Sequence, residues 1–322
     1  MGSCETIRLL KRYLQMYWLK PFDAVNDTAN AAALLKFDWT RGPLLEIGGG
    51  DGVFSFIMHA GAFRFLDDRY DQADVAKKGD IYDIYKEGRS LGICKNATLR
   101  YDLGIDLKLS HLLKARKTGI CKYLTSSLPE ALPAKDNHFG TIFLYTFHGL
   151  TDYERTLQEI RRVIKSDGRL LMLVVNSGVR ENFVCYKLHR FFNKVGFKAL
   201  SDYFLALDGG RHDEIGGIFS KSAREWEALL KKGGFRIEEA YSQVSPLLWR
   251  IYDTQTRPFL KLMIRMNRLL KYLRLKFIAK VLWVYLWLPV ISIFYFAMAR
   301  PKKVMLDSRC RDIFLAVTAT PL

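Results

Sequence analysis

The sequence has few of the residues that build disulfide frameworks and structural metal sites. It contains 5 cysteines and 6 histidines in 322 residues, and no two cysteines form a Cys-x-x-Cys pair. Scattered cysteines of this kind are typical of proteins that fold in a reducing compartment. We therefore expect a cytosolic setting, without a disulfide scaffold and without a bound metal.

Other absences narrow the architecture. No secretory signal is evident, because Arg8, Lys11 and Arg12 interrupt the apolar pattern near the N-terminus. The sequence has no internal repeat and no low-complexity tract. Its 322 residues then predict one large domain with additions, because a single hydrophobic core seldom grows beyond that size.

Acidic residues are scarce, and their distribution bears on the partner. The chain has 50 Lys and Arg against 33 Asp and Glu, a net charge of +17 that favours nucleic acid or a lipid surface as partner. Residues 257–300 contain no acidic residue at all. Basic side chains recur there at helical spacing between apolar ones, at Arg257, Lys261, Arg265, Arg268, Lys271, Arg274, Lys276 and Lys280.

A long uncharged run follows this basic segment directly. Val281–Ala299 carries no charge, has Trp and Tyr residues near interface depth and Pro289 near its middle, and is followed by further basic residues. A run of this length with these flanks is typical of membrane contact. We therefore expect a membrane surface as the anionic partner. Nucleic acid is not expected, because the sequence shows no added RNA-binding module.

The stretch around which the chain is organised is a glycine-rich turn after a short apolar run. Leu44–Ile47 suits a buried strand, and Gly48-Gly49-Gly50-Asp51-Gly52 follows it, before a helical pattern that starts at Val53. Glycines lack a Cβ, so backbone can pass close to a ligand, and the helix N-terminus beyond them offers unpaired N–H groups. This stretch predicts a ligand site.

Strands and helices alternate downstream of that turn. The expected strands are Tyr101–Leu107, Cys121–Thr125, Thr141–Thr146 and Arg169–Asn176, and the expected helices are Leu109–Arg116 and Glu154–Ile164. This alternation predicts an α/β fold with a doubly wound, mostly parallel sheet and helices on both faces. Ligands of such sheets bind at the carboxyl ends of the strands, the edge that carries the glycine turn.

With these motifs the chain resembles the class I S-adenosylmethionine-dependent methyltransferases, which have a seven-stranded Rossmann-like sheet. Their first motif, an acidic residue followed by x-Gly-x-Gly-x-Gly, is matched by Glu46, Gly48, Gly50 and Gly52. Leu132-Pro133-Ala134 and Lys165-Ser166-Asp167-Gly168 lie where a large group of these enzymes has Leu-Pro-Phe and Lys-Pro-Gly-Gly. A dinucleotide dehydrogenase would need Gly-x-Gly-x-x-Gly, and here the third glycine comes one residue too early.

The resemblance implies S-adenosylmethionine as the cofactor and assigns its contacts. Glu46 and the glycines of the motif would lie at the methionine end, and Asp106, after the second strand, would accept hydrogen bonds from the ribose hydroxyls. Asp68 is the alternative ribose acid. After the third strand, where related enzymes place an acid against adenine, this chain has Ser127 and Leu128, so a hydroxyl or backbone group would make that contact.

Two histidines are candidates for a catalytic role. The sulfonium donor is already activated, so a general base is needed only if the acceptor is a hydroxyl or an acidic carbon. His148, just beyond the fourth strand, is the first candidate for that base. His212, in a glycine-flanked loop after the fifth strand, is the second.

The chain is expected to divide into a core and its additions. We expect a basic and aromatic helical segment at 1–40, a methyltransferase core at 41–256 with an insertion at 62–100 and a substrate lid at 177–221, a basic and apolar membrane-associated insertion at 257–303, and the final strand of the core at 304–322. That strand returns the chain to the cytosolic sheet. The apolar run must therefore enter and leave the membrane on one side, with Pro289 as the expected break.

These inferences predict methyl transfer to a lipid-like or lipid-linked acceptor at the cytoplasmic face of a membrane, where a monotopic or re-entrant segment holds the enzyme. The alternative is a membrane-bound module that keeps the fold and has lost catalysis. The intact glycine motif and Asp106 favour the enzyme. The acceptor atom and the oligomeric state remain open at this level.

Overall fold

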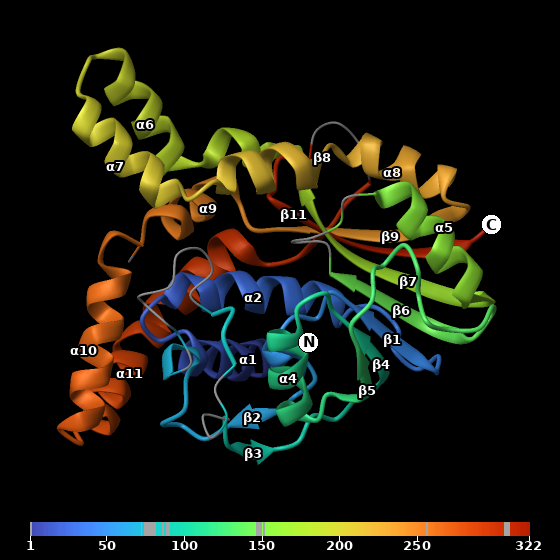
Figure 1. Cartoon of the computed structure of the whole chain (residues 1–322), viewed down its shortest axis with the longest axis horizontal. Coiled ribbons are helices and arrows are strands. Elements are labelled where there is room, and N and C mark those ends of the chain that lie inside the picture. Colours follow the sequence, from blue (N-terminus) through green and yellow to red (C-terminus); the bar gives the residue numbers. More distant parts are fainter. Residues whose placement is uncertain are drawn as a thin grey trace.

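A mixed β-sheet with helices on both faces forms the centre of the molecule (Figure 1). The computed structural model describes residues 2–71, 73, 82–85, 87, 91–145, 150, 152–255, 257–305 and 310–322. The sheet of nine strands in this part of the chain runs in the order β10-β9-β11-β7-β6-β1-β4-β5, with β8 paired to the end of β7. Its strands are β1 Leu44–Ile47, β4 Tyr101–Ile105, β5 Cys121–Thr125, β6 Phe139–Tyr145, β7 Ile164–Asn176, β8 Ser220–Lys221, β9 Phe235–Gln243, β10 Lys302–Lys303 and β11 Phe314–Pro321.

The strand directions confirm the doubly wound α/β fold. Strands β5, β4, β1, β6 and β7 pair in parallel, and β11 lies antiparallel between β7 and β9. The last strand therefore returns into the core sheet, as expected from the sequence. The order of the strands reverses between β1 and β6, and this is where ligands of doubly wound sheets bind.

Helices cover the two faces of the sheet because alternate strand residues point to opposite sides. In β7, Leu171, Leu173 and Val175 join one core, and Leu170 and Met172 join the other. The first core contains α1 Ser3–Met16, α2 Pro21–Leu34, α3 Val53–Met58 and α9 Pro246–Thr254, and the second contains α5 Tyr153–Val163 and α8 Ala223–Lys232. Helix α4 Leu109–Thr118 connects β4 to β5.

The second strand of the sheet is β4, and the alternative assignment is wrong. Leu103 and Ile105 pair with Leu45 and Ile47 of β1, so the carboxylate that ends this strand belongs to Asp106. Within the insertion at 62–100, β2 Ala62–Phe63 and β3 Ile93–Lys95 form a separate antiparallel pair, and η1 Arg69–Asp71 is a short 3-10 turn.

Asp68, the alternative ribose acid, instead lies in a fully buried polar cluster. Its carboxylate accepts a hydrogen bond from Trp18 Nε1 at 2.7 Å. The Nζ atoms of Lys276 and Lys280 approach the same carboxylate at 3.0 and 3.7 Å, and Lys276 also pairs with Asp71 at 2.8 Å. Asp68 therefore joins the N-terminal segment, the insertion and a C-terminal helix, and it serves the fold.

The basic and apolar segment forms a helical hairpin. It consists of α10 Leu260–Tyr272 and α11 Lys276–Phe294. The 3-10 helix η4 Arg257–Phe259 precedes it, and the π-helix η5 Tyr295–Ala299 follows it. The chain reverses near Arg274, which has a φ of 59°, and the expected break at Pro289 is wrong because α11 continues through it. Val284 and Ile291 on either side of Pro289 are both buried, so packing keeps the helix continuous.

Helix α11 is attached to the body along one face. It contacts α1 and α2, and the ring of Phe22 packs against Trp287 and Phe294 at centroid distances of 6.1 and 5.1 Å. Lys276–Ala299 is long and apolar enough to cross a membrane by length and composition alone. In this structure, however, the helix lies along the body of the protein, where its two lysines are buried and where it packs on α1 and α2.

We expect Asp68→Ala to lower the free energy of unfolding by about 3–5 kcal/mol, because Lys280 would remain buried without its carboxylate and Lys276 would keep Asp71 alone. Urea denaturation measures the change. Asp136→Ala is the control, because it breaks an exposed pair with Arg162 and should cost less than about 1 kcal/mol. Equal losses in the two variants would contradict the anchoring role of Asp68.

Candidate functional site

The glycine turn closes over the end of β1, and two of its glycines are required by the fold itself. Gly48 has a φ of +76°, and a Cβ there would lie 2.8 Å from the carbonyl oxygen of Tyr145. A Cβ on Gly49 would overlap the carboxyl group of Glu46 beneath it. The turn therefore folds tightly between the ends of β1 and β6.

Gly50 differs from its neighbours, because its open side faces the carboxyl edge of the sheet. Its φ is +60°, and the nearest atom that an added Cβ would meet is His111 Nδ1 at 4.0 Å. Its amide donates a hydrogen bond to Asp106 Oδ2 at 3.0 Å. The hydrogen bond joins the turn after β1 to the end of the neighbouring strand β4.

Asp106 is held ionised at this edge. Burial alone would raise its pKa, but hydrogen bonds from His111 and from the backbone N–H groups of Lys108 and Gly50 outweigh burial and lower the pKa below its usual value. The Lys108 amide donates at 2.8 Å, and His111 Nδ1 lies 3.6 Å away. A fixed carboxylate of this kind suits a pair of neighbouring hydroxyl groups.

Glu46 lies beneath the glycine turn. Its carboxyl group is 2% exposed and accepts hydrogen bonds from Ser55 Oγ and, at 3.7 Å, from Cys121 Sγ. Burial raises the pKa of Glu46 to about 7, and burial with the nearby Glu46 raises the pKa of Cys121. The contacts of Glu46 support the turn, and its expected contact with the methionine end stays a prediction.

Ser127 and Leu128 follow β5, at the same edge as Asp106. Ser127 Oγ donates a hydrogen bond to the carbonyl of Ala131 at 2.7 Å, and the side chain of Leu128 is exposed. Strands β1, β4 and β5 are neighbours. The predicted cofactor-binding residues Glu46, Gly48, Gly50, Gly52, Asp106, Ser127 and Leu128 therefore follow or end three adjacent strands.

The two predicted catalytic histidines have different outcomes. His148 lies outside the described residues. His212 begins the π-helix η3 His212–Phe219. Its ring stacks on the ring of Tyr186 at a centroid distance of 3.6 Å, and its Nδ1 lies 3.1 Å from Asp213 Oδ1. These partners of His212 belong to the 177–221 segment, so its catalytic role stays a prediction.

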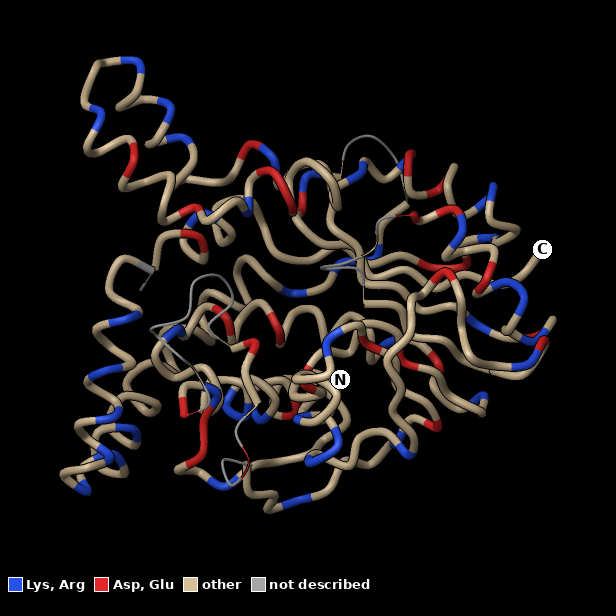
Figure 2. The backbone as a smooth tube through the Cα atoms, in the orientation of Figure 1, with Lys and Arg blue, Asp and Glu red and all other residues tan. Residues whose placement is uncertain are grey.

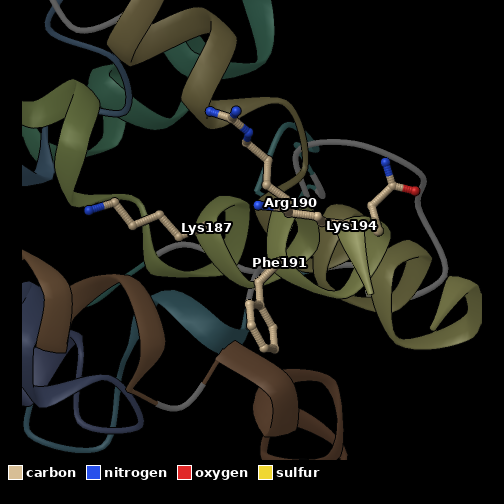
Figure 3. Close-up of a pocket in the computed structure, with 5 residues that line it drawn as sticks. Lys187, Arg190, Phe191 and Lys194 are labelled. Carbon is tan, nitrogen blue, oxygen red and sulfur yellow. The ribbon is translucent and has the colours of Figure 1, made fainter. Parts of the chain in front are cut away.

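The outer part of the expected lid projects from the body. Helices α6 Val184–Lys194 and α7 Lys198–Asp208 pack on each other, and α6 also packs on α9, away from the glycine turn (Figure 1). Side chains on one stretch of α6 surround an open pocket of about 480 Å³ (Figure 3), and they are Lys187, Arg190, Phe191, Asn193 and Lys194. This hairpin does not cover the glycine turn, so a lid at 177–221 would have to come from its inner parts.

A second group of residues, missed from the sequence, lies at the end of β6. Tyr145 ends this strand, and its ring packs on Phe54 at 5.3 Å. Tyr13 of α1 packs on Phe54 at 6.0 Å and donates a hydrogen bond to its carbonyl at 2.9 Å. The N-terminal helices therefore cover the point where the strand order reverses.

A chain of polar contacts continues from the glycine turn to α2. Arg69 pairs with Asp51 at 3.1 Å and donates a hydrogen bond to Tyr17 Oη at 3.2 Å. Burial raises the pKa of Asp27 in α2 to about 7, and the nearby Tyr17 hydroxyl lowers it in part. Among the described residues, Nε of Arg69 is buried without a hydrogen-bond partner.

One signal for Asp27 was present in the sequence. It lies in Pro21–Leu34, an alanine-rich segment whose side chains are otherwise largely buried. An acidic residue in the buried face of such a helix is costly unless it has a partner or a function. No comparable signal marked Arg69, because it lies in the insertion, whose position depends on tertiary contacts.

The raised pKa of Glu46 predicts a pH-dependent stability. Because the pKa is about 7 in the folded protein, above the usual 4.5, the contribution of Glu46 is fully present below pH 4.5 and is lost as the pH rises through 7. Glu46→Gln should therefore unfold at a higher temperature than wild type at pH 8. Its melting temperature should also fall less between pH 5 and pH 8 than that of wild type. Thermal melts with the exposed Glu227→Gln as control check this, and an unchanged pH dependence would contradict it.

Comparisons with known proteins agree with this geometry. Residues 88–172 match the methyltransferase domain family. An uncharacterised protein of Methanocaldococcus jannaschii is 30% identical over 112 residues, which are 35% of this chain and 45% of that protein. The chain thus spans less than half the length of this curated relative.

Two solved structures are similar to this chain, and the first of them shows its fold. One is a methyltransferase of Thermotoga maritima, described as S-adenosylmethionine-dependent and possibly a histamine N-methyltransferase. It is 15% identical to this chain, the match covers 98% of this chain and 99% of that chain, and the TM-score is 0.50. The other is a geranyl diphosphate methyltransferase solved with its diphosphate and sinefungin, with 11% identity, 92% and 77% covered, and a TM-score of 0.46. Residues 88–172 thus match a methyltransferase domain, for which S-adenosylmethionine is the implied cofactor, and the chain has the fold of the class I methyltransferases.

Proposed function

We propose that this protein is an S-adenosylmethionine-dependent methyltransferase at the cytoplasmic face of a membrane, and that its acceptor is a lipid or a lipid-linked molecule. The observation that carries the catalytic part is the hydrogen bond between Gly50 and Asp106. It joins a Cβ-free turn and an ionised carboxylate at the ends of two adjacent parallel strands. The matched methyltransferase domain supports the same conclusion.

The residues present fit the cofactor. Asp106 would hold the ribose hydroxyls, and the backbone of the glycine turn would lie against the methionine end. S-adenosylmethionine supplies a methyl group already activated on a sulfonium. The protein then has to position the acceptor in line with that group and exclude water. The aromatic cover formed by Tyr13, Phe54 and Tyr145 suits that task.

The membrane part of the proposal rests on the outer surface of the hairpin α10–α11. Apolar side chains, single or in adjacent pairs, are exposed along α11 about once per helical turn, at Phe277, Ile278, Leu282, Tyr285, Leu286, Val290 and Ile293. Lys and Arg lie along α10 and the turn to α11, without acidic residues among them (Figure 2). An apolar stripe beside basic side chains is the pattern of a helix that lies in the interface of an anionic bilayer.

The opposite side of α11 argues against a transmembrane orientation. Lys276 and Lys280 are buried against Asp68, and Val284, Ile291 and Tyr295 are buried against the body. A helix that crossed the bilayer would have to break these contacts and separate the two lysines from Asp68. A monotopic segment keeps them and still offers its outer stripe to lipid.

The place of the hairpin supports a lipid acceptor. Helix α11 packs on α1 and α2, and Tyr13 of α1 packs on Phe54, which covers Tyr145 at the end of β6. A bilayer that met the outer face of α11 would therefore lie one helix layer from the proposed site. A membrane acceptor could reach the methyl donor without crossing bulk water.

The direct test is chemical. Purified protein is incubated with S-adenosylmethionine carrying a labelled methyl group and with total membrane lipids, and mass spectrometry identifies the methylated species. A labelled lipid supports the proposal. Cofactor binding without any methylated product would favour the alternative, a membrane-bound module that has lost catalysis.

Gly50→Val and Asp106→Ala should each weaken the binding of S-adenosylmethionine by about 100-fold or more, measured by calorimetric titration, because one fills the path of the cofactor and the other removes two charged hydrogen bonds. Gly119→Val is a matched control. Gly119 also has a positive φ, +66°, and open space around its Cα, but it precedes β5 at the opposite edge of the sheet. Unchanged affinity in the first two variants would overturn the cofactor site.

Replacing Ile278, Leu282, Leu286 and Ile293 together by Ser should lower the affinity for vesicles of phosphatidylcholine and phosphatidylserine by at least about 100-fold, because each loses apolar area that the lipid would bury. Co-sedimentation measures it. The control replaces Leu66, Ile218, Met305 and Leu322, which are also exposed and lie elsewhere, by Ser. Equal sedimentation of both proteins would contradict the role of the hairpin.

A further inference from the structure

The α6–α7 hairpin projects from the body at the same end of the molecule as the α10–α11 hairpin, at the left of Figure 1. Its base is fixed on one buried carboxylate. Asp253 accepts a hydrogen bond from the amide of Cys185 in α6 at 3.1 Å and pairs with Arg211, after α7, at 2.6 Å. Within the hairpin, Phe192 of α6 stacks on Phe204 of α7 at a centroid distance of 5.6 Å. The hairpin is therefore a packed element with a fixed base.

The outer surface of this hairpin carries large apolar side chains. Between 43% and 62% of each is exposed, and they are Phe191, Val195, Phe197, Leu200, Tyr203 and Leu205. Exposed apolar side chains that are scattered singly are ordinary on protein surfaces. Four of these six instead lie within residues 191–200, where α6 turns into α7. An apolar group of this kind on a projecting element indicates a binding surface.

The end of the hairpin, residues 187–200, is also basic, and we call it the tip. It has no acidic residue and carries four cationic side chains, at Lys187, Arg190, Lys194 and Lys198. The first three line the open pocket of about 480 Å³ on α6 (Figure 3). Guanidinium and ammonium groups that are gathered in this way bind phosphate groups well. The tip therefore combines phosphate-binding cations with exposed apolar side chains.

Both hairpins leave the sheet at its carboxyl edge. The α6–α7 hairpin follows β7 through η2 Ser177–Asn182, and the α10–α11 hairpin follows β9 through α9. Strand β11 is antiparallel to β7 and to β9, so β7 and β9 end at the same edge as β6 and β1, which are parallel to β7. That edge also carries the glycine turn and Asp106. Helix α9 packs on both α6 and η4, and it therefore joins the bases of the two hairpins.

We propose that the tip of the α6–α7 hairpin is a second membrane contact, at which its cations bind the phosphate groups of anionic lipids and its apolar side chains enter the bilayer interface. The choice of a bilayer as partner rests on the proposed function. An anionic bilayer suits the tip because it offers phosphate groups and an apolar layer side by side. A nucleic acid would use the cations and stack on aromatic rings, but Val195 and Leu200 offer it no ring.

Two separate contacts would hold the protein in one orientation on the membrane. A single helix in the interface leaves the protein free to roll about the helix axis. A second contact on another hairpin removes that freedom and strengthens binding without a change in either surface. Because both hairpins leave the carboxyl edge of the sheet, that edge would face the lipid. The proposed methyl-transfer site would then be turned towards a membrane acceptor.

The first test removes the charge of the tip. One variant replaces three of its cations by Gln, at Lys187, Arg190 and Lys194. The control replaces three exposed cations elsewhere by Gln, at Arg116, Lys117 and Lys231. Co-sedimentation of the full chain measures affinity for vesicles of phosphatidylcholine with and without phosphatidylserine. The tip variant should lose about 10- to 100-fold of its affinity for the vesicles with phosphatidylserine and none for those without it. Equal losses in variant and control would show an effect of net charge alone and overturn the proposal.

The second test removes the apolar surface of the tip. Phe191→Ser combined with Phe197→Ser should lower the affinity for both kinds of vesicle by about 10-fold or more, because less apolar area enters the lipid. Replacing the same two residues by Trp should keep the wild-type affinity, since Trp favours the bilayer interface. The control combines Tyr123→Ser with Leu322→Ser, two side chains of similar exposure away from the hairpins, and should bind as wild type does. Unchanged melting temperatures show that all variants are folded.

The outcomes separate this proposal from the proposed function. Wild-type binding by both tip variants, with a loss in the Ser variant of α11, overturns the second contact alone. The reverse result supports the tip and overturns the role of the α10–α11 hairpin. Wild-type protein that binds neither kind of vesicle overturns both contacts, while the titration of the cofactor still tests the methyltransferase. If the charge variant loses affinity for single-stranded RNA and keeps its affinity for vesicles, the tip binds nucleic acid and the proposal is overturned.

Discussion

The arrangement around the site depends on the buried contact of Asp68 with Lys276 and Lys280. Burying two lysines is unfavourable unless a carboxylate lies close to them. The contact with Asp68 therefore favours this placement of α11 over others. Trp18 donates to the same carboxylate, which fixes the end of α1 to the insertion. Three segments that are far apart in the sequence are thereby held together beside the end of β6, and the helices that cover the site are part of that assembly.

The N-terminal segment and the insertion limit the access of water to the end of β6. In a bare doubly wound sheet the reversal between β1 and β6 would be open to water at the carboxyl edge. Here Tyr13 of α1 hydrogen-bonds the backbone of Phe54, and Arg69 of the insertion hydrogen-bonds Tyr17, which follows α1. The residues proposed for the cofactor therefore belong to the core, and residues outside the core close the end of β6.

The core of the fold could be predicted from the sequence because local signals suffice for it. The glycine turn follows a strand, Asp106 ends β4, and the last strand joins the sheet, each marked by a short apolar run beside turn residues. The break at Pro289 could not be predicted, because burial of Val284 and Ile291 on both sides keeps the helix continuous. The places of Asp27 and Arg69 were missed for the same reason, since tertiary packing determines both.

The two faces of α11 connect the proposed membrane contact to the proposed site. Its inner face holds α1 and α2 through Phe22, Val284 and Ile291, and its outer face carries a stripe of exposed apolar side chains. Burial of that stripe in lipid would favour the same placement of α11 that the Asp68 cluster favours, since only then do all its apolar side chains leave water. Membrane binding and the closed packing of Tyr13, Phe54 and Tyr145 would therefore stabilise each other, because both require α11 to lie against α1 and α2. An enzyme with the proposed lipid acceptor would then be best assembled where that acceptor is found.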